Sequence, residues 1–361
     1  MMKRNGGYGV RVMEVITGGE PGGAQRHVVE LIQYLVEAGH TVTLVHGGGR
    51  WVESQLKGVS TVRYLPDLVR DIRPQADRRA LAALVDMMRT EGPDVVHCHS
   101  SKAGILARYA AHRVGVPAVY TAHGYVFQDP TQSNSFRLLF RTLERWAARR
   151  SAAIITMTAD DERFARQYGP VDHVYRIVNG VKATEPPLPG AAGNRVGFLG
   201  RFSREKGLHD LLAVIAAHPE WRLELAGDGL FRPLVEQYQA QHANIHWRGW
   251  VDELANFFES IDVLVQPSAK EGAPYSVLDA LAAGVPVVGT RVGAMTEMLD
   301  VVDPHLAVEP GDREALAAAI QYALLNRAAL AERAYAVASN QYALSNQLER
   351  TLSVLKEVSR S

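Results

Sequence analysis

The chain has 361 residues, of which 47% are hydrophobic and 22% are charged, and its formal net charge at pH 7 is zero. This length exceeds what one ordinary hydrophobic core supports, so we expect two domains. The composition is that of an ordinary globular protein, and the balanced charge argues against binding of nucleic acid through a general basic field.

The N-terminus and the cysteine content favour a cytoplasmic protein. The polar segment 1–9 has no apolar secretion-signal region behind it, and no apolar run approaches the roughly 18 residues that a membrane-spanning helix needs. The one cysteine, Cys98, lies in the apolar segment 95–98, so a disulfide framework is excluded. A reducing cytosol is the simplest setting for such a chain.

Short β-branched segments alternate with helical patterns along the first half of the chain, which is typical of a parallel sheet covered on both faces. The predicted strands are Val10 to Thr17, Thr41 to His46, Val62 to Leu65, Val95 to His99, Ala118 to Thr121, Ile154 to Thr158 and Tyr175 to Val178. The clearest predicted helices are Ala24 to Ala38, Asp77 to Thr90, Ala103 to His112, Ser135 to Arg150 and Asp160 to Tyr168. This pattern predicts a doubly wound α/β domain.

The same alternation starts again in the second half of the chain. The predicted strands there are Val196 to Leu199, Arg222 to Ala226, Ile245 to Arg248, Val263 to Gln266, Val285 to Thr290 and His305 to Val308. After Asp312 the chain is alanine-rich and almost wholly helical in pattern. A second doubly wound domain is therefore expected.

A turn at Asn179 and a Pro/Gly-rich segment at 185–190 separate the two halves and have the composition of a linker. We predict an N-terminal domain at 1–182 and a C-terminal domain at 183–361. A C-terminal helix at about 342–358 is expected to pack back on the N-terminal domain. The linker is a reasonable hinge for closure.

Ligands of open α/β sheets lie outside the carboxyl ends of the strands, so loops after strands, in a cleft between the two domains, are the expected site. The first strand runs into residues 18–23 (GGEPGG) and then a helix. Gly22 and Gly23 let the backbone approach a ligand closely, and a helix N-terminus favours an anion. The spacing is not that of the dinucleotide fingerprint, so phosphate contact and a plain tight turn both remain open.

The first strand of the second domain is followed by residues 200–207 (GRFSREKG). Arg201 can hold a phosphate through two parallel N–H bonds, and Lys206 supplies a mobile point charge. Together they would oppose the charge of a diphosphate. An exposed charged loop is the alternative, but the flanking glycines and the position after a strand favour binding.

Histidines lie at the ends of two strands in the first domain. His123 is placed to bind a sugar hydroxyl or to assist proton transfer, or else to cap local backbone. His97 and His99 share one strand face, but a metal site would need further ligands and the sequence nominates none. The acidic run 160–162 follows Thr158 at the start of a helical pattern, which favours capping over metal binding.

The segment 263–297 has the most site-like pattern of the chain. It predicts a buried strand, Glu271, a short helix that carries Asp279, and a second buried strand. Pro274 suits the first turn of that helix, whose free N–H groups would point toward Glu271 and favour a phosphate. The carboxylates suit the hydroxyls of a ribose or a sugar. A sugar nucleotide offers both groups.

The helical segment 135–150 carries a basic stripe with apolar flanks. Its arginines recur every four residues at Arg137, Arg141, Arg145 and Arg149. Such a face suits anionic lipid headgroups. A solvated charged face over an apolar core contact is the alternative.

Taken together, these motifs resemble those of retaining glycosyltransferase family 4, a large group of enzymes with the GT-B fold of two Rossmann-like domains. The resemblance covers nearly the whole chain, and the order and spacing of the motifs make it specific. The matching segments are 22–25 (GGAQ), 95–100 (VVHCHS), 101–104 (SKAG), 121–124 (TAHG), 179–181 (NGV), 200–201 (GR), 206–207 (KG), 226–229 (AGDG) and 265–297.

The resemblance implies that 1–182 is the acceptor-binding domain and that 183–361 is the nucleotide-sugar-binding domain, and it implies roles for these residues. The family's glycine turn and Arg/Lys pair hold the donor diphosphate, and its histidine contacts the transferred sugar. Of its two glutamates seven residues apart, the first contacts the sugar and the second the ribose; Asp279, one methylene shorter, stands at the second position. The catalytic residues so implied are His123, Glu271, Arg201 and Lys206. The donor-binding residues are Gly22, Gly23, Gly200, Arg201, Lys206, Glu271, Gly272, Ala273, Pro274, Tyr275, Asp279 and Glu297.

The family resemblance also implies a mechanism and partners. Transfer retains the anomeric configuration by front-face departure, with no metal and no other cofactor, and the leaving phosphate takes the acceptor's proton. The donor is a UDP- or GDP-sugar and the acceptor a lipid-linked or other glycan of bacterial surface polysaccharide synthesis, at the inner face of the membrane. The alternatives are a sugar-nucleotide epimerase, a phosphorylase, or a non-catalytic sugar-nucleotide-binding protein, for which Asp279 is the sequence hint.

Overall fold

The computed structural model of the chain describes residues 9–183 and 193–360. The polar N-terminal segment 1–8 and the linker 185–190 lie outside the described residues. The chain divides into two compact units. The first unit holds the residues up to Gln128, Asn134–Ile177 and those from Leu348 on, and the second unit holds Asp129–Ser133 and Val178–Gln347.

The first unit contains a parallel sheet of seven strands in the order β3-β2-β1-β4-β5-β6-β7. The strands are β1 (Arg11–Gly18), β2 (Thr41–Gly48), β3 (Thr61–Tyr64), β4 (Val95–His99), β5 (Ala118–Ala122), β6 (Ala153–Thr156) and β7 (Val174–Arg176). The helices that connect them are α1 (Gly23–Glu37), α2 (Trp51–Gln55), α3 (Pro74–Glu91), α4 (Ser101–Val114), η1 (Val126–Gln128), α5 (Asn134–Ala148), α6 (Ala159–Tyr168) and η2 (Val171–His173).

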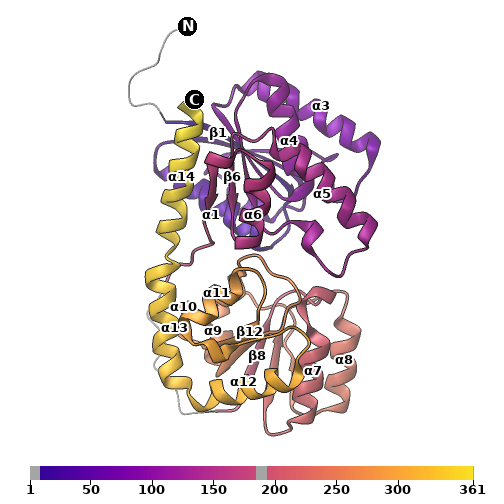
Figure 1. The fold of residues 1–361 in the computed structure, drawn as a ribbon, viewed down its shortest axis with the longest axis vertical. Helices are drawn as coiled ribbons and strands as arrows, with labels where there is room; N and C mark the ends of the chain where they lie inside the picture. The colour runs from indigo at the N-terminus through magenta and orange to yellow at the C-terminus, as the bar shows by residue number, and fades with distance from the viewer. Residues whose placement is uncertain (1–8, 184–192, 361) are drawn as a thin grey trace. The chain divides into compact units, whose positions relative to one another are not determined.

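The two faces of this sheet differ in character because side chains alternate along each strand. Met13, Val96 and Cys98 belong to the apolar core that also takes in α3 and α4, and Figure 1 shows these two helices with α5 on one side of the sheet. Cys98 is fully buried there, and burial raises the pKa of its thiol to about 12. Glu14 and His97 have the opposite parity, so the other face carries polar groups.

The second unit contains a parallel sheet of six strands in the order β10-β9-β8-β11-β12-β13. The strands are β8 (Arg195–Leu199), β9 (Arg222–Ala226), β10 (Ile245–Trp247), β11 (Val263–Gln266), β12 (Val287–Thr290) and β13 (Ala307–Val308). The helices are η3 (Arg204–Lys206), α7 (Leu208–Ala217), α8 (Arg232–Gln241), α9 (Leu254–Glu259), α10 (Tyr275–Ala282), α11 (Gly293–Val302), η4 (Pro304–Leu306), α12 (Arg313–Leu325) and α13 (Arg327–Gln341). In Figure 1, α7 and α8 lie side by side, and α13 packs on α10 and α11.

The helix α14 (Leu344–Arg360) closes the chain, and the division between the two units falls within it. Its residues from Leu348 on belong to the first unit, where Tyr175 donates a hydrogen bond to Glu357 over 2.9 Å. The predicted alternation of strands and helices and the helical C-terminal region are confirmed. Thr158 is also confirmed as a helix cap, because its hydroxyl accepts the Asp161 amide over 3.0 Å.

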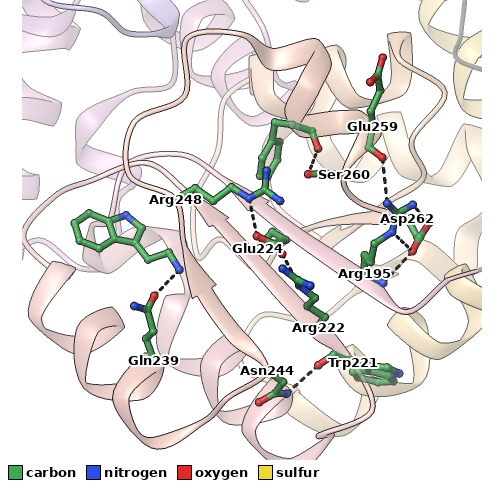
Figure 2. A network of polar contacts seen from close by, with 12 residues as sticks. Arg195, Trp221, Arg222, Glu224, Gln239, Asn244, Arg248, Glu259, Ser260 and Asp262 are labelled. Atoms are coloured by element: carbon green, nitrogen blue, oxygen red, sulfur yellow. Dashed lines mark hydrogen bonds and ion pairs between the residues drawn. The ribbon is translucent and has the colours of Figure 1, made fainter.

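Buried acids in the second unit are held by arginines at the ends of the strands: Arg195 and Arg222 begin β8 and β9, and Arg248 follows β10 (Figure 2). Asp262 is fully buried and accepts two hydrogen bonds from the Arg195 guanidinium, over 2.8 and 3.0 Å. Glu224 is bracketed by Arg222 at 2.7 Å and Arg248 at 2.6 Å. These ion pairs hold the sheet and lie away from the loops at the carboxyl ends of β8 and β11.

Candidate functional site

Each sheet has one point where the chain connections leave in opposite directions. In the first sheet this point lies between β1 and β4, and in the second between β8 and β11. Open α/β sheets bind ligands at the carboxyl ends of the strands beside such a point. Most of the predicted site residues follow β1, β8 or β11, whereas His123 follows the neighbouring β5 and Glu297 lies on α11 after β12.

In the second unit, Lys206 and Glu271 form an ion pair that joins the loops after β8 and β11. The Lys206 Nζ lies 2.7 Å from Glu271 Oε1, and the two side chains are only 19% and 9% exposed. The hydroxyl of the buried Ser268 donates to the same carboxylate oxygen over 2.7 Å. The sequence placed the cation and the acid at one site, and the structure confirms their proximity. It also adds Ser268, which the sequence analysis missed.

Two glycines allow these loops to approach each other. Gly207, with φ of +66°, has no room for a side chain because a Cβ would lie 1.8 Å from the carbonyl oxygen of Pro267. Gly293, the first residue of α11, has φ of +56°, and a Cβ there would lie 2.0 Å from the carbonyl oxygen of Glu271. Positive φ and close backbone contact both require glycine. The backbone that carries Glu271 is therefore fixed by its packing against α11.

The helix α10 begins one residue later than expected. Pro274 is its N-cap, with an extended ψ of 125°, and its carbonyl oxygen accepts the Leu278 amide over 3.2 Å. The prediction that Pro274 occupies the first turn is thus wrong by one position, because its backbone is extended where helical dihedrals were expected. A proline has no polar side chain with which to cap a helix, and no side chain among the described residues caps the N-terminus of α10.

The other predicted donor residues of the second unit differ in their burial and in their hydrogen bonds. Ala273 is buried, and its carbonyl oxygen accepts a hydrogen bond from the buried Asn179 over 2.8 Å. The carbonyl oxygen of Gly272 accepts the Ala294 amide of α11 over 2.9 Å. Tyr275 is buried in the first turn of α10, and the half-buried Asp279 and Glu297 lie on α10 and α11.

Arg201 differs from Lys206 although both follow β8. Its side chain is exposed, and its guanidinium makes no hydrogen bond or ion pair with any residue that the structure describes. The neighbouring Gly200 is held by its amide, which donates to the Ala226 carbonyl over 3.0 Å. An exposed guanidinium on a fixed backbone can turn toward an anion without losing a partner.

In the first unit, the glycine turn leads directly into α1. Gly22 is the N-cap in an extended conformation, with φ of 176°, and Gly23 is the first helical residue. Since Gly22 has no side chain, α1 begins without a cap from its N-cap residue, as α10 does. A Cβ on Gly22 would lie 2.6 Å from Gln25 Oε1, the flexible end of a side chain.

A chain of buried side chains crosses the polar face of the first sheet. The two oxygens of Glu14 lie 3.0 Å from His97 Nδ1 and 2.8 Å from His99 Nε2. At its ends, His97 Nε2 lies 2.7 Å from the Thr121 hydroxyl, and His99 Nδ1 lies 3.0 Å from His123 Nε2. All of these side chains are fully buried except that of His123, which is half-buried on the loop after β5.

His27 of α1 packs edge-on against His123, with ring centroids 4.9 Å apart. Burial first, and then the neighbouring histidines, lowers the pKa of both His99 and His123 well below its ordinary value. Both imidazoles are therefore neutral at physiological pH. A neutral imidazole can accept one hydrogen bond and donate another, which suits contact with a hydroxyl group.

The structure brings candidate metal ligands within reach of His97 and His99 that the sequence alone did not nominate. The candidate ligand atoms of His27, His99 and His123 lie within 4.8 Å of one another, and so do those of Glu14, His97 and His99. The partners come from β1 and α1, far away in sequence, which is why the strand alone did not nominate them. The distance between His99 and His123 is that of a hydrogen bond.

The basic stripe on α5 is only partly free. Arg137 donates to the carbonyl oxygen of Phe127 over 2.9 Å, and the Arg145 guanidinium lies 4.3 Å from the centre of the Tyr168 ring. Arg141 and Arg149 are exposed. Three apolar side chains of the same helix are also exposed, at 67% for Leu138, 48% for Leu139 and 38% for Trp146.

None of the helices in the part of the chain that the structure describes combines the length and the apolar character that a membrane crossing requires.

Two family models match the chain, one in each half. The model described as Glycosyltransferase Family 4 matches residues 21–185, and the model described as Glycosyl transferases group 1 matches residues 193–326. The Glu14 strand lies outside the first match, whereas the predicted donor residues of both halves lie within these ranges.

Relatives and solved structures agree with these matches. A UDP-Gal:alpha-D-GlcNAc-diphosphoundecaprenol alpha-1,3-galactosyltransferase of Escherichia coli is 30% identical over 63% of this chain and 66% of its own length. The lipopolysaccharide core biosynthesis glycosyltransferase LpsE of Rhizobium meliloti is 27% identical over 90% of this chain and 93% of its own length. The crystal structure of Anabaena Alr3699/HepE in complex with UDP-glucose covers 96% of this chain and 100% of its own, with a TM-score of 0.80 and 19% identity.

The alignment with the E. coli enzyme spans about two thirds of that protein, and the likeness to the Anabaena structure, at its low identity, concerns the fold. Two Rossmann-like sheets with this strand order and this structural likeness confirm the expected GT-B fold. The two sequence matches together run from residue 21 to residue 326 with a short gap. The chain belongs to the glycosyltransferase family 4 proteins.

Proposed function

We propose that the chain is a retaining glycosyltransferase that moves a sugar from a UDP- or GDP-sugar to a lipid-linked or glycan acceptor in bacterial surface polysaccharide synthesis. The observation that carries this proposal is the ion pair of Lys206 and Glu271, which joins two loops at the switch point of the second sheet. A carboxylate for sugar hydroxyls and a cation for phosphate, 2.7 Å apart, match the two halves of a sugar nucleotide.

The proposed mechanism uses charge stabilisation of the leaving diphosphate. Lys206, Arg201 and the first-turn N–H groups of α10 would hold the negative charge that develops as the glycosidic bond breaks. Gly22, Gly23 and the N-terminus of α1 would add further N–H groups. Glu271 and His123 would orient the transferred sugar, and the departing phosphate would take the acceptor's proton. These residues account for the transfer without a metal ion.

Names of relatives support the choice of substrates. The E. coli relative is named for a UDP-galactose donor and a diphosphoundecaprenol-linked acceptor, and the Anabaena structure holds UDP-glucose. We therefore favour UDP over GDP, and we propose a polyprenyl-diphosphate-linked acceptor. An epimerase would convert the nucleotide sugar with no acceptor present, and a non-catalytic protein would bind the donor without converting it.

The test is a panel of UDP- and GDP-sugars incubated with the full chain, with and without a polyprenyl-diphosphate-linked sugar, in the presence and absence of EDTA. We expect release of nucleoside diphosphate and a glycosylated lipid that depend on the acceptor and are insensitive to EDTA. NMR of the product should show the anomeric configuration of the donor. Conversion without acceptor, or binding without conversion by any donor, would reject transferase activity.

We also propose that α5 contacts an anionic membrane, which would place the protein at the inner face of the cytoplasmic membrane. The exposed Leu138, Leu139 and Trp146 lie on the helix that presents Arg141, with Arg149 just beyond its end. Co-sedimentation with phosphatidylglycerol vesicles, but not with phosphatidylcholine vesicles, is expected. Leu138→Ser should weaken it, and equal binding to both lipids would reject this surface.

A further inference from the structure

The polar face of the first sheet carries a carboxylate that the proposed reaction does not use. Glu14 is fully buried on β1 among apolar residues, and none of the arginines or lysines that the structure describes is bonded to it. Its two oxygens each meet a histidine of β4, because β1 and β4 pair with Glu14 opposite His97. A buried carboxylate is costly unless its hydrogen bonds are satisfied. This one is satisfied by histidines alone, one of which bonds to His123.

The hydrogen-bonding rules of carboxylates and imidazoles assign a direction to the bonds that lead from Glu14 to His123. An ionised carboxylate only accepts, so Glu14 receives an N–H from His99 Nε2. The neutral His99 ring carries one N–H, so its Nδ1 is an acceptor and receives an N–H from His123 Nε2.

The proton on His123 Nε2 leaves its other ring nitrogen with a lone pair. Nδ1 of His123 has no hydrogen-bond partner among the residues that the structure describes. The lowered pKa of His123 keeps the ring from taking up a second proton near neutral pH. A nitrogen of this kind accepts a hydrogen bond from a hydroxyl and rejects carbonyl or phosphate oxygens.

We propose that Glu14, acting through His99, is a positioning residue that fixes His123 as the Nε2–H tautomer, so that Nδ1 meets a hydroxyl of the donor sugar as an acceptor. This inference rests on the proposed function for the identity of the sugar and on the hydrogen-bond geometry alone for the tautomer. It assigns Glu14 and His99 a part in substrate recognition although both are buried away from the ligand.

The direct test is long-range ¹H–¹⁵N NMR of the full chain labelled at histidine, with His123 assigned by its loss in His123→Gln. The lone-pair resonance of His123 is expected at Nδ1 in the absence of any donor. A proton at Nδ1 would mean that the bonds run in the opposite direction, from a protonated Glu14, and would overturn the proposal. Stoichiometric binding of added Zn²⁺ that shifts the His27, His99 and His123 signals would overturn it as well.

Two variants separate positioning from packing. Glu14→Gln can donate its amide N–H to His99, which would reverse the bond to His123, so the His123 lone pair should move to Nε2 or divide between the two nitrogens. Thr121→Val disturbs the same buried cluster on the far side of His97 and should leave the His123 tautomer unchanged. The positioning role of Glu14 would be contradicted if the His123 tautomer changed in Thr121→Val, or if it did not change in a folded Glu14→Gln.

Donor analogues link the tautomer to recognition. Among monodeoxy forms of the turned-over sugar nucleotide, the one without the contacted hydroxyl should lose roughly tenfold in kcat/KM with the parent chain, as expected for one hydrogen bond. The same analogue should lose at most about twofold with Glu14→Gln. If no donor is turned over but the lone pair is found at Nδ1 of His123, the proposed function is wrong, whereas the positioning of His123 by Glu14 and His99 is confirmed. Equal losses in both chains would overturn the recognition role.

Discussion

Replacement of Lys206 by methionine tests whether this cation binds phosphate or only neutralises Glu271. Methionine keeps the length of the side chain and removes the charge. The pair is largely buried, with side chains 19% and 9% exposed, so its loss deprives the Glu271 carboxylate of its cation and should lower the free energy of unfolding by about 1–3 kcal/mol. A charge-assisted hydrogen bond to a diphosphate contributes roughly 1.5–3 kcal/mol to binding, and its loss corresponds to a rise of about 10- to 150-fold in the Kd for UDP.

The assay is isothermal titration of UDP into four chains, with urea unfolding as the check on stability. Arg204→Met is the matched control, because Arg204 is an exposed cation on the same 3₁₀ helix η3 and has no bonded partner among the described residues. It should change the Kd less than threefold. Lys206→Met should raise the Kd for UDP about 10- to 150-fold. The double variant Lys206→Met/Glu271→Gln should regain only that part of the lost affinity that comes from the unpaired negative charge of Glu271.

Two results would refute this reasoning. If Lys206→Met bound UDP as well as the parent chain, the cation would not contact the diphosphate. If the double variant recovered the full affinity, the cation would serve only to neutralise Glu271. The ammonium has three donors, so contact with Glu271 does not prevent contact with a phosphate.

Three further predictions concern the fold that holds the site. Gly293→Ala should lower the free energy of unfolding by about 2–4 kcal/mol through strain and a backbone clash, whereas Gly311→Ala, with φ of +84° and open space around its Cβ position, should lose about 1 kcal/mol in a urea titration. Burial alone would raise the pKa of Asp262, but hydrogen bonds from Arg195 outweigh it and hold that pKa below its ordinary value. The stabilisation of the fold by ionised Asp262 is therefore complete above about pH 4 and is lost as the pH falls through the lowered pKa. Asp262→Asn should lower the free energy of unfolding by about 2 kcal/mol at pH 7 and by progressively less toward pH 2. A thiol reagent at pH 8 should modify Cys98 only in unfolded protein, since its pKa is raised to about 12 and it is fully buried; rapid labelling of the native chain would contradict this.

Those parts of the site that follow strands could be predicted from the sequence. Lys206 and Glu271 each lie in a loop directly after a buried strand, and parallel strands bring such loops to one edge of the sheet. The rule places both residues at one edge of the sheet. Their direct contact depends on β8 and β11 being neighbours, and that strand order and the ion pair itself came from the structure.

The buried half of the first cluster could not be predicted in this way. Glu14 lies inside an apolar strand, and its histidine partners come 83 and 85 residues later. Only the register between β1 and β4 brings them together, and a sequence pattern does not encode register between distant parallel strands. The available signal was a lone acid in a fully buried strand, together with His97 and His99 two residues apart on one face.

The four-residue spacing of arginines on α5 predicts that they share one face of the helix, but it does not predict which of them have partners. Spacing places Arg137 and Arg145 on the same face as Arg141, whereas the structure gives the first a backbone partner and the second an aromatic one. Long side chains choose their partners from what the neighbouring elements present, and those neighbours were unknown at the level of the sequence. The exposed Leu138 was not singled out for the same reason.

The buried Glu14 is informative because stability alone does not account for it. Replacing a buried carboxylate and its partners by apolar side chains of similar volume is commonly neutral or stabilising, and the neighbours Val12, Met13, Val15 and Ile16 on the same strand are apolar. A polar chain that costs stability and leads from the switch-point strands β1 and β4 to a half-buried histidine on the loop after β5 is what a functional constraint produces. The Lys206–Glu271 pair lies at the switch point of the second sheet. In each unit, polar groups that core packing does not require therefore lie where the fold favours a ligand.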